Sequence, residues 1–150
     1  MKRFLRLPPV IPALCTIFAG VVHNTVWAFE PLQEPWNNIS GGIILAIAVL
    51  MFTVSILAFR RRGESFNVGK PTANLVTGGI YATSRNPAYL AMLIAIFGIG
   101  CVANSLAIIL ATIPSFVVFN WYTIPREERY LMGKLGFVYD QYRNRVRRWI

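Results

Sequence analysis

Four long apolar runs constrain the fold more than any other feature of this chain. They cover residues 10–29, 39–59, 87–103 and 106–122. An α-helix rises about 1.5 Å per residue, so ~20 residues cross a hydrocarbon core of ~30 Å. The first two runs have that length; the last two are shorter and are separated by only two residues. We therefore expect an all-α, multi-pass transmembrane bundle with four crossings, in which the last two runs form a tight hairpin.

The basic residues indicate how such a bundle is oriented. Lys and Arg number 15, against 6 Asp and Glu. With four crossings, every Lys and Arg falls on one side of the membrane, whereas the short loop after the first run carries Glu30 and Glu34. The positive-inside rule then places both termini in the cytoplasm, at the bacterial inner membrane or the endoplasmic reticulum, depending on the source. A nucleic-acid binder is disfavoured because no basic stripe interleaves with aromatic residues outside the membrane flanks. We expect the lipid bilayer as a partner, and no nucleic acid.

Three features of the apolar runs have ordinary explanations. The start resembles a signal peptide, but no A-x-A cleavage site follows, so we expect an uncleaved first helix. Cys15 and Cys101 lie inside apolar runs and are expected to be free and structural. His23 belongs to a polar patch at residues 23–25, which is either an intramembrane polar site or, as we favour, an interfacial or interhelical contact.

The first polar stretch with the features of a site is residues 75–89, which read LVTGGIYATSRNPAY. Gly78 and Gly79 allow backbone conformations that other residues avoid, and they permit close approach to a ligand. Asn86 and Pro87 are typical of a helix start, with Asn as the cap and Pro at the first position. A helix start also leaves free N–H groups in front of it. The pattern therefore predicts a ligand site here.

The second polar stretch follows the fourth run. Pro125 suits the first turn of a helix, and Glu127 and Glu128 suit its positive end. Residues 137–149 form an amphipathic, basic segment that either lies against the bilayer or folds over the polar loop. Tyr139 and Tyr142 are expected to pack in this segment, and its last three arginines to face the membrane. Because the hairpin joins the two polar stretches, they are expected to meet in space. The sequence contains no metal-binding set of His and Cys, no phosphate-binding loop and no Ser/His/Asp candidate, so we expect no metal.

These two stretches resemble a known family. The first is similar to the signature of isoprenylcysteine carboxyl methyltransferases, a glycine-tyrosine turn that leads into an arginine-histidine-proline helix start. The second, EERYLMGKLGFVYDQYRNRV, resembles that family's double-glutamate helix and its closing arginine-valine. The match covers about residues 71–150, and phospholipid methyltransferases share the broad pattern. The resemblance implies an integral-membrane methyltransferase that uses S-adenosylmethionine and acts on a lipophilic acceptor.

The resemblance also implies roles for individual residues. Those expected to bind the cofactor are Ala73, Asn74, Leu75, Val76, Tyr81, Asn86, Pro87, Ala88, Tyr89 and Glu127. Arg126 and Glu128 are the expected catalytic residues. The chain departs from the family at Asn86 and Ala73, where the family has histidines, and at Thr123, where it has the arginine that contacts the prenylated substrate. Thr123 and Arg126 are therefore the expected substrate-binding residues, with Arg126 as the replacement cation.

The residues leave more than one function open. We expect one domain over residues 1–150, with a first helix pair in 1–62 and a cofactor-binding half in 63–150. Its function is methyl transfer, most like isoprenylcysteine carboxyl O-methylation. A phospholipid or small-lipid methyltransferase is the first alternative, and an amine acceptor there would need Glu128 or a tyrosine as base. The second alternative is a scaffold of the same fold without catalysis, and a related sterol-reductase-like fold is more remote. The acceptor and the oligomeric state remain open.

Overall fold

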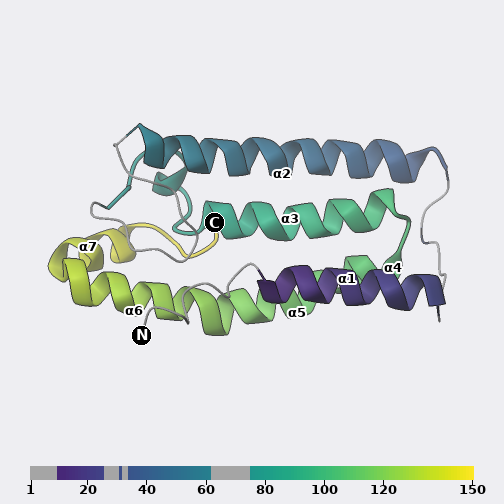
Figure 1. Cartoon of the computed structure of the whole chain (residues 1–150). Coiled ribbons are helices and arrows are strands. Elements are labelled where there is room, and N and C mark those ends of the chain that lie inside the picture. Colours follow the sequence, from purple (N-terminus) through teal and green to yellow (C-terminus); the bar gives the residue numbers. More distant parts are fainter. Residues whose placement is uncertain (1–9, 26–30, 32–33, 62–74) are drawn as a thin grey trace.

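The computed structural model describes residues 10–25, 31, 34–61 and 75–150, and every regular element in these ranges is helical. The predicted cofactor residues Ala73 and Asn74 belong to the stretch 62–74, which lies outside the described residues. Figure 1 shows long helices that run side by side along one direction, with shorter elements gathered at one end. The expected all-helical class is confirmed for the described part of the chain.

Helices α2 (Trp36–Arg60) and α3 (Pro87–Val102) form a closely packed antiparallel pair. Glycine permits this approach, because a Cβ atom at Gly41 would lie 2.7 Å from the backbone nitrogen of Val102. A Cβ atom at Gly98 would lie 3.0 Å from side-chain atoms of α2. Two backbones can approach closely where small residues face each other, and this contact supplies dispersion energy without a buried polar group.

A tight hairpin connects α3 to α4 (Leu106–Leu110), as the sequence predicted. Asn104 takes a left-handed conformation with φ 48°, and the Ser105 hydroxyl caps the new helix by accepting from the Ile108 N–H at 3.4 Å. Gly100 makes room for the return, since a Cβ atom there would lie 2.7 Å from the backbone nitrogen of Ile109. The hairpin therefore brings the last turn of α3 against the first turn of α4.

Four helical segments follow as one continuous rod, α4, α5 (Thr112–Val117), the π-helical η3 (Val118–Thr123) and α6 (Ile124–Leu135). Pro114 lacks the N–H that would bond to the Leu110 carbonyl, and the regular α-helix is interrupted just before it. Pro125 lies in the first turn of α6 as expected, but no break precedes it. The rod has 30 residues and a length of about 45 Å, which exceeds a ~30 Å hydrocarbon core. Its charged end, from Arg126 onward, therefore extends beyond such a core.

Helix α1 (Val10–Thr25) packs beside α4 and α5 through a cluster that contains Ala19, Ile96 and Ile108. By length and composition, α2 and the rod are long and apolar enough to cross a membrane. Helices α1 and α3 have 16 residues each and are shorter. The number of crossings and the side on which each terminus lies stay predictions.

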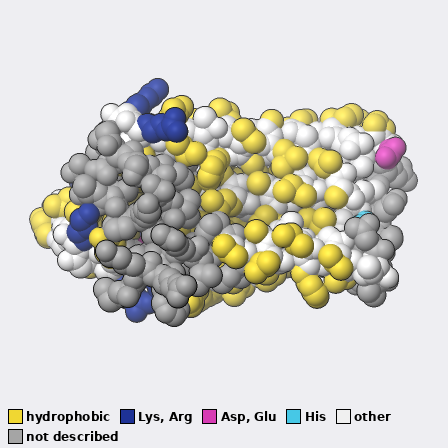
Figure 2. Space-filling view, viewed as in Figure 1, with side chains coloured by type: hydrophobic (Ala, Val, Ile, Leu, Met, Phe, Trp, Pro, Cys, Tyr) yellow, Lys and Arg dark blue, Asp and Glu magenta, His cyan; other side chains and the backbone are white. Residues whose placement is uncertain are grey.

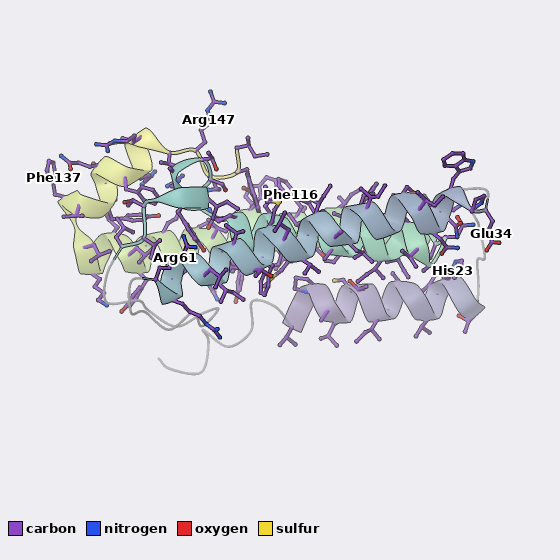
Figure 3. All side chains as sticks on the ribbon, turned by 90° about the horizontal axis from the view of Figure 1, so that it is seen from above. His23, Glu34, Arg61, Phe116, Phe137 and Arg147 are labelled. Carbon is purple, nitrogen blue, oxygen red and sulfur yellow. The ribbon has the colours of Figure 1, made fainter. Side chains whose placement is uncertain are left out.

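The two ends of the bundle differ in charge. Figure 2 shows hydrophobic side chains along the helices and Lys and Arg side chains at one end. In Figure 3, Arg61 and Arg147 lie at that end, and His23 and Glu34 lie at the other. His23 therefore lies at the opposite end of the bundle from Arg61 and Arg147. Cys15 and Cys101 are both free.

The polar end is built by a turn, a short helix and the last residues of the chain. The turn contains the 3-10 helix η2 (Gly79–Ala82), which leads to the start of α3. After Gly136, whose φ of 51° favours glycine, α7 (Phe137–Arg145) folds back from α6. Tyr139, Tyr142 and Val146 form a buried cluster, so the expected packing of both tyrosines is confirmed. Figure 1 shows the C-terminus close to the start of α3.

Candidate active site

The two polar stretches meet at the polar end, as the sequence predicted. The Tyr142 hydroxyl donates to the Tyr81 carbonyl at 2.7 Å, and the Arg85 N–H donates to the Arg147 carbonyl at 3.0 Å. Asn86 Nδ2 donates to the Arg148 carbonyl, also at 3.0 Å. In each of these bonds, the donor and the acceptor are more than 60 positions apart in the sequence. Together the bonds hold the turn before α3 against α7 and the C-terminal segment 146–150.

A pair of a buried tyrosine and a half-buried glutamate lies where α3 faces α6. The Tyr89 hydroxyl donates to Glu127 Oε1 at 2.6 Å, and the Tyr89 ring packs on Phe119 with centroids 4.8 Å apart. Glu127 belongs to the charged end of the rod, beyond its apolar part. Burial raises the pKa of Glu127 to about 7, against the opposing effect of the Tyr89 hydrogen bond and with a further contribution from the charge of Glu128. The Glu127 carboxyl group is thus a half-buried acceptor whose charge changes near neutral pH.

Tyr81 joins α2 to this site. Its side chain is buried and meets the Phe59 ring edge to face, with centroids 5.2 Å apart. Burial raises the pKa of Tyr81, and Tyr142 and Glu127 raise it further, whereas a hydrogen bond with the Ser55 side chain lowers it. The Tyr81 hydroxyl therefore lies within electrostatic range of Glu127. Two of the predicted cofactor residues, from different elements, are brought into one neighbourhood.

Glu128 faces a different set of partners. Its Oε2 lies 2.8 Å from Arg148 Nη2, and its Oε1 lies 3.3 Å from Arg148 Nε and 3.1 Å from Arg85 Nη1. The Glu128 side chain is 11% exposed and that of Arg85 is 10% exposed. A carboxylate held by two guanidinium groups is fixed in position. The predicted catalytic role of Glu128 stays a prediction, and the structure gives the residue a clear positioning role.

The π-helical segment η3 explains how Arg148 is held. In an i→i+5 ladder, the carbonyl of Asn120 would accept from the N–H of residue 125, which is proline and has none. Arg148 Nη1 supplies the missing donor, at 3.2 Å from the Asn120 carbonyl oxygen. Trp149 Nε1 donates to Asn120 Oδ1 at 3.1 Å. The expectation that Arg148 faces the membrane is therefore wrong, because its side chain fills a position that Pro125 leaves open.

The remaining predicted residues are distributed as follows. Val76, Pro87 and Ala88 are buried, and Leu75 packs against the tyrosine cluster of α7. No side chain caps α3, because Asn86 donates to the C-terminal segment instead of accepting from the helix. The expected cap by Asn86 is therefore wrong, although the helix begins at Pro87 as predicted.

The two expected substrate residues lie in different environments. Thr123 is buried, and its hydroxyl oxygen has no hydrogen-bond partner among the described residues. Arg126 is exposed, with its guanidinium carbon 3.5 Å from the centroid of the Tyr122 ring. A cation over an aromatic face at the charged end of the rod suits the membrane interface. The two residues lie about one helical turn apart on the rod, one buried and the other exposed.

The sequence analysis missed three residues of this site, Arg85, Asn120 and Arg148. Two signals could have found the last two, namely the proline at position 125 in a helix and the buried donor that its orphaned carbonyl needs. Arg85 directly precedes the predicted cap and could have been included for its charge alone. Within the described residues, no group of three or more His, Cys, Asp or Glu is placed to hold a metal ion.

Comparisons with known proteins place the chain in a family. Neither the comparison with curated proteins nor the comparison with solved structures gave a match. The comparison with protein families matched residues 36–136, about two thirds of the chain, to phospholipid methyltransferases. The matched segment includes α2, α3 and the whole rod, and therefore both Tyr89 and Glu127. The chain belongs to the phospholipid methyltransferase family of membrane methyltransferases.

Proposed function

We propose that the chain transfers a methyl group from S-adenosylmethionine to a lipid acceptor at the polar end of the bundle. The observation that carries this proposal is the part-buried hydrogen bond of 2.6 Å between Tyr89 and Glu127. It lies inside the family-matched segment, between the uncapped start of α3 and the charged end of the rod. A carboxylate whose pKa is shifted toward neutrality is a common feature of a binding site for a cationic or hydroxyl-bearing ligand.

The donor and the described residues fit one another chemically. Glu127 offers a carboxylate for a ribose diol or an ammonium group, and the N–H groups of the uncapped first turn of α3 suit a carboxylate. Tyr81 and Val76 are buried nearby and offer apolar surface for an adenine ring. S-adenosylmethionine supplies a methyl group on a positively charged sulfur, and transfer of that group leaves a neutral thioether. The residues of this chain contribute binding, alignment and exclusion of water.

The acceptor is a lipid, and two chemical classes remain in question. The family match favours a phospholipid, whose amine would be methylated on nitrogen. The sequence resemblance favours a prenylated cysteine, whose carboxylate would be methylated on oxygen. Thr123 is buried one helical turn before Glu127 with its hydroxyl unpartnered in the described part of the chain, which suits contact with either acceptor. Arg126, exposed beside Tyr122, suits the anionic part of a lipid head group.

The membrane arrangement belongs to the same proposal. Four crossings with both termini in the cytoplasm would place the polar end at the cytoplasmic face, where an acceptor can enter from the bilayer. The exposed apolar residues of α2 support contact with lipid, among them Ile43, Ile47 and Leu50. Reporter fusions placed after residue 31 and after residue 150 test this arrangement. We expect opposite sides for the two fusions, and the same side for both would contradict it.

The decisive experiment is a calorimetric titration of the detergent-purified protein with S-adenosylmethionine. We expect binding by the parent and a loss of at least tenfold in Glu127→Gln, because the carboxylate is removed. Glu34→Gln is the matched control, since Glu34 is exposed at the other end of the bundle, and it should bind like the parent. A folded parent that does not bind would favour the non-catalytic scaffold.

Product chemistry then separates the two acceptor classes. A methyl ester formed on prenylcysteine releases methanol in base, whereas the N-methyl bond of a phospholipid head group survives even though the acyl esters are hydrolysed. Incubation with labelled donor and each acceptor, followed by base treatment, gives the answer directly. Label that is volatile after base treatment would support O-methylation, and label that stays non-volatile on the head group would support N-methylation.

A further inference from the structure

Arg85 carries buried hydrogen-bond donors without an acceptor. Its side chain is 10% exposed, and Nε and Nη1 have no hydrogen-bond partner among the described residues. Nη1 lies 3.1 Å from Glu128 Oε1, but the geometry does not make a hydrogen bond. Burial of charged donors without acceptors is costly, so such groups usually mark a place where a further partner binds.

The charges around Arg85 do not balance. Glu128 is shared by two guanidinium groups, and Arg148 holds both of its oxygens, at 2.8 and 3.3 Å. The other nearby carboxylate, Glu127, is bonded to Tyr89, and neither arginine is among the groups that shift its pKa. The cluster of Arg85, Arg148 and Glu128 therefore keeps one excess positive charge in a mostly buried place, which an anion would neutralise.

The surroundings of Arg85 add to this positive character. Arg85 directly precedes Asn86 and Pro87, where α3 begins without a side-chain cap. The N-terminal end of a 16-residue helix carries partial positive charge, and its free N–H groups favour anions. Tyr139 and Tyr142 both lie within electrostatic range of the arginine, so two tyrosine side chains line the same place.

We propose that Arg85 binds the anionic group of a ligand, a carboxylate or a phosphate, with Glu128 and Arg148 as the residues that position it. The guanidinium stays charged, and its unpartnered Nε and Nη1 each offer an N–H group to an anion. The identity of the ligand rests on the proposed function. The anion belongs either to the amino-acid part of the methyl donor or to the head group of the acceptor lipid.

Binding measurements on Arg85→Gln distinguish these two sources. S-adenosylmethionine is compared with decarboxylated S-adenosylmethionine, which keeps the sulfonium and the ammonium groups but lacks the carboxylate. If the donor supplies the anion, the parent should prefer the carboxylated form at least tenfold, and Arg85→Gln should bind both alike. If the acceptor supplies it, Arg85→Gln should bind both donors like the parent but short-chain phosphatidylethanolamine at least tenfold more weakly.

Controls separate an anion site from a structural role. Arg147→Gln is the matched control, because Arg147 is exposed and its side chain points away from the molecule (Figure 3). Arg85→Lys keeps the buried charge without the planar guanidinium, and we expect it to restore part of the affinity lost in Arg85→Gln. If a folded Arg85→Gln changes neither the donor preference nor the phospholipid affinity, the proposal is overturned.

Failure of this inference can be told apart from failure of the proposed function. A parent that binds S-adenosylmethionine with the same affinity ratio as Arg85→Gln, and phospholipid equally well, keeps its function and loses the anion site. A parent that does not bind the donor loses the proposed function, and inorganic phosphate then decides the inference. Protection of the parent but not of Arg85→Gln against thermal unfolding by phosphate would support the site, and equal behaviour would overturn it.

Discussion

The apolar bundle and the polar end are held together by different kinds of interaction. In the bundle, α2 packs on α3 and α3 on α4 through close contacts at Gly41, Gly98 and Gly100. At the polar end, the turn before α3 is joined to α7 and the C-terminal segment by side-chain and backbone hydrogen bonds across more than 60 residues. Helix packing in the bundle depends on the size and shape of the side chains, whereas the polar end depends on specific hydrogen-bond donors and acceptors. Substitutions should therefore act through crowding in the bundle and through lost partners at the polar end.

The largest effect is expected from Glu128→Ala, which breaks the polar end at its centre. Two guanidinium groups would lose the carboxylate between them, and removal of one partner from a buried ion pair costs about 3–5 kcal/mol. The free energy of unfolding in detergent measures this loss, and Glu34→Ala is the exposed control. A loss of unfolding free energy below about 1 kcal/mol would mean that water solvates the two guanidinium groups well enough to replace the carboxylate.

Gly100→Ala should destabilise the apolar bundle at the hairpin between α3 and α4. The new Cβ atom would lie 2.7 Å from the backbone nitrogen of Ile109. A backbone atom cannot relieve this overlap by a change of rotamer, as a side chain could. We expect a cost of roughly 2 kcal/mol from overpacking. Gly42→Ala is the matched control, because nothing lies within 4 Å of its Cβ position, and it should be neutral or slightly stabilising. Equal stability of the two variants in a thermal unfolding assay would show that the hairpin backbone shifts to accommodate the new Cβ atom at little cost in free energy.

Tyr142→Phe tests the hydrogen bonding of the polar end alone, because the phenylalanine ring keeps the packing. It removes the hydroxyl that donates to the Tyr81 carbonyl and leaves that buried carbonyl without this donor, at a cost of roughly 1–2 kcal/mol. Because the loss falls on the turn before α3, hydrogen exchange should increase in residues 79–86 and stay unchanged in α2. A uniform increase across the bundle would contradict the separation of the two regions.

The smallest effect concerns pH and Glu127. With a pKa of about 7, Glu127 is about half ionised at pH 7 and about one-tenth ionised at pH 6. If its carboxylate form binds the donor, affinity should fall about fivefold from pH 7 to pH 6 and level off above pH 8. In the ligand-free protein the sign is opposite, because the folded state holds this proton more tightly than the unfolded state, so stability should fall as pH rises from 4.5 to 7. Glu127→Gln should flatten both profiles.

The same contrast explains what the sequence could predict. Apolar runs fix the positions of α2, α3 and the hairpin, because helix length and turn residues are local properties. The meeting of the two polar stretches followed from the hairpin alone. The role of Asn86 could not be read locally, since its side chain can either accept from a helix start or donate elsewhere, and the Arg148 carbonyl, 62 positions away, decided which. The partners of Arg85 and Glu128 could not be predicted locally either, because they depend on the reversal of the chain at Gly136.

The carbonyl that Pro125 deprives of a backbone donor has a consequence for the order of assembly. Its donor is the side chain of residue 148, which the ribosome adds 28 residues after Asn120. The apolar helices can pack as soon as α4 and α5 leave the ribosome, because their contacts lie early in the chain. The polar end must wait for the last residues. A nascent chain stalled before residue 148 would therefore hold a finished bundle with an open, incomplete site.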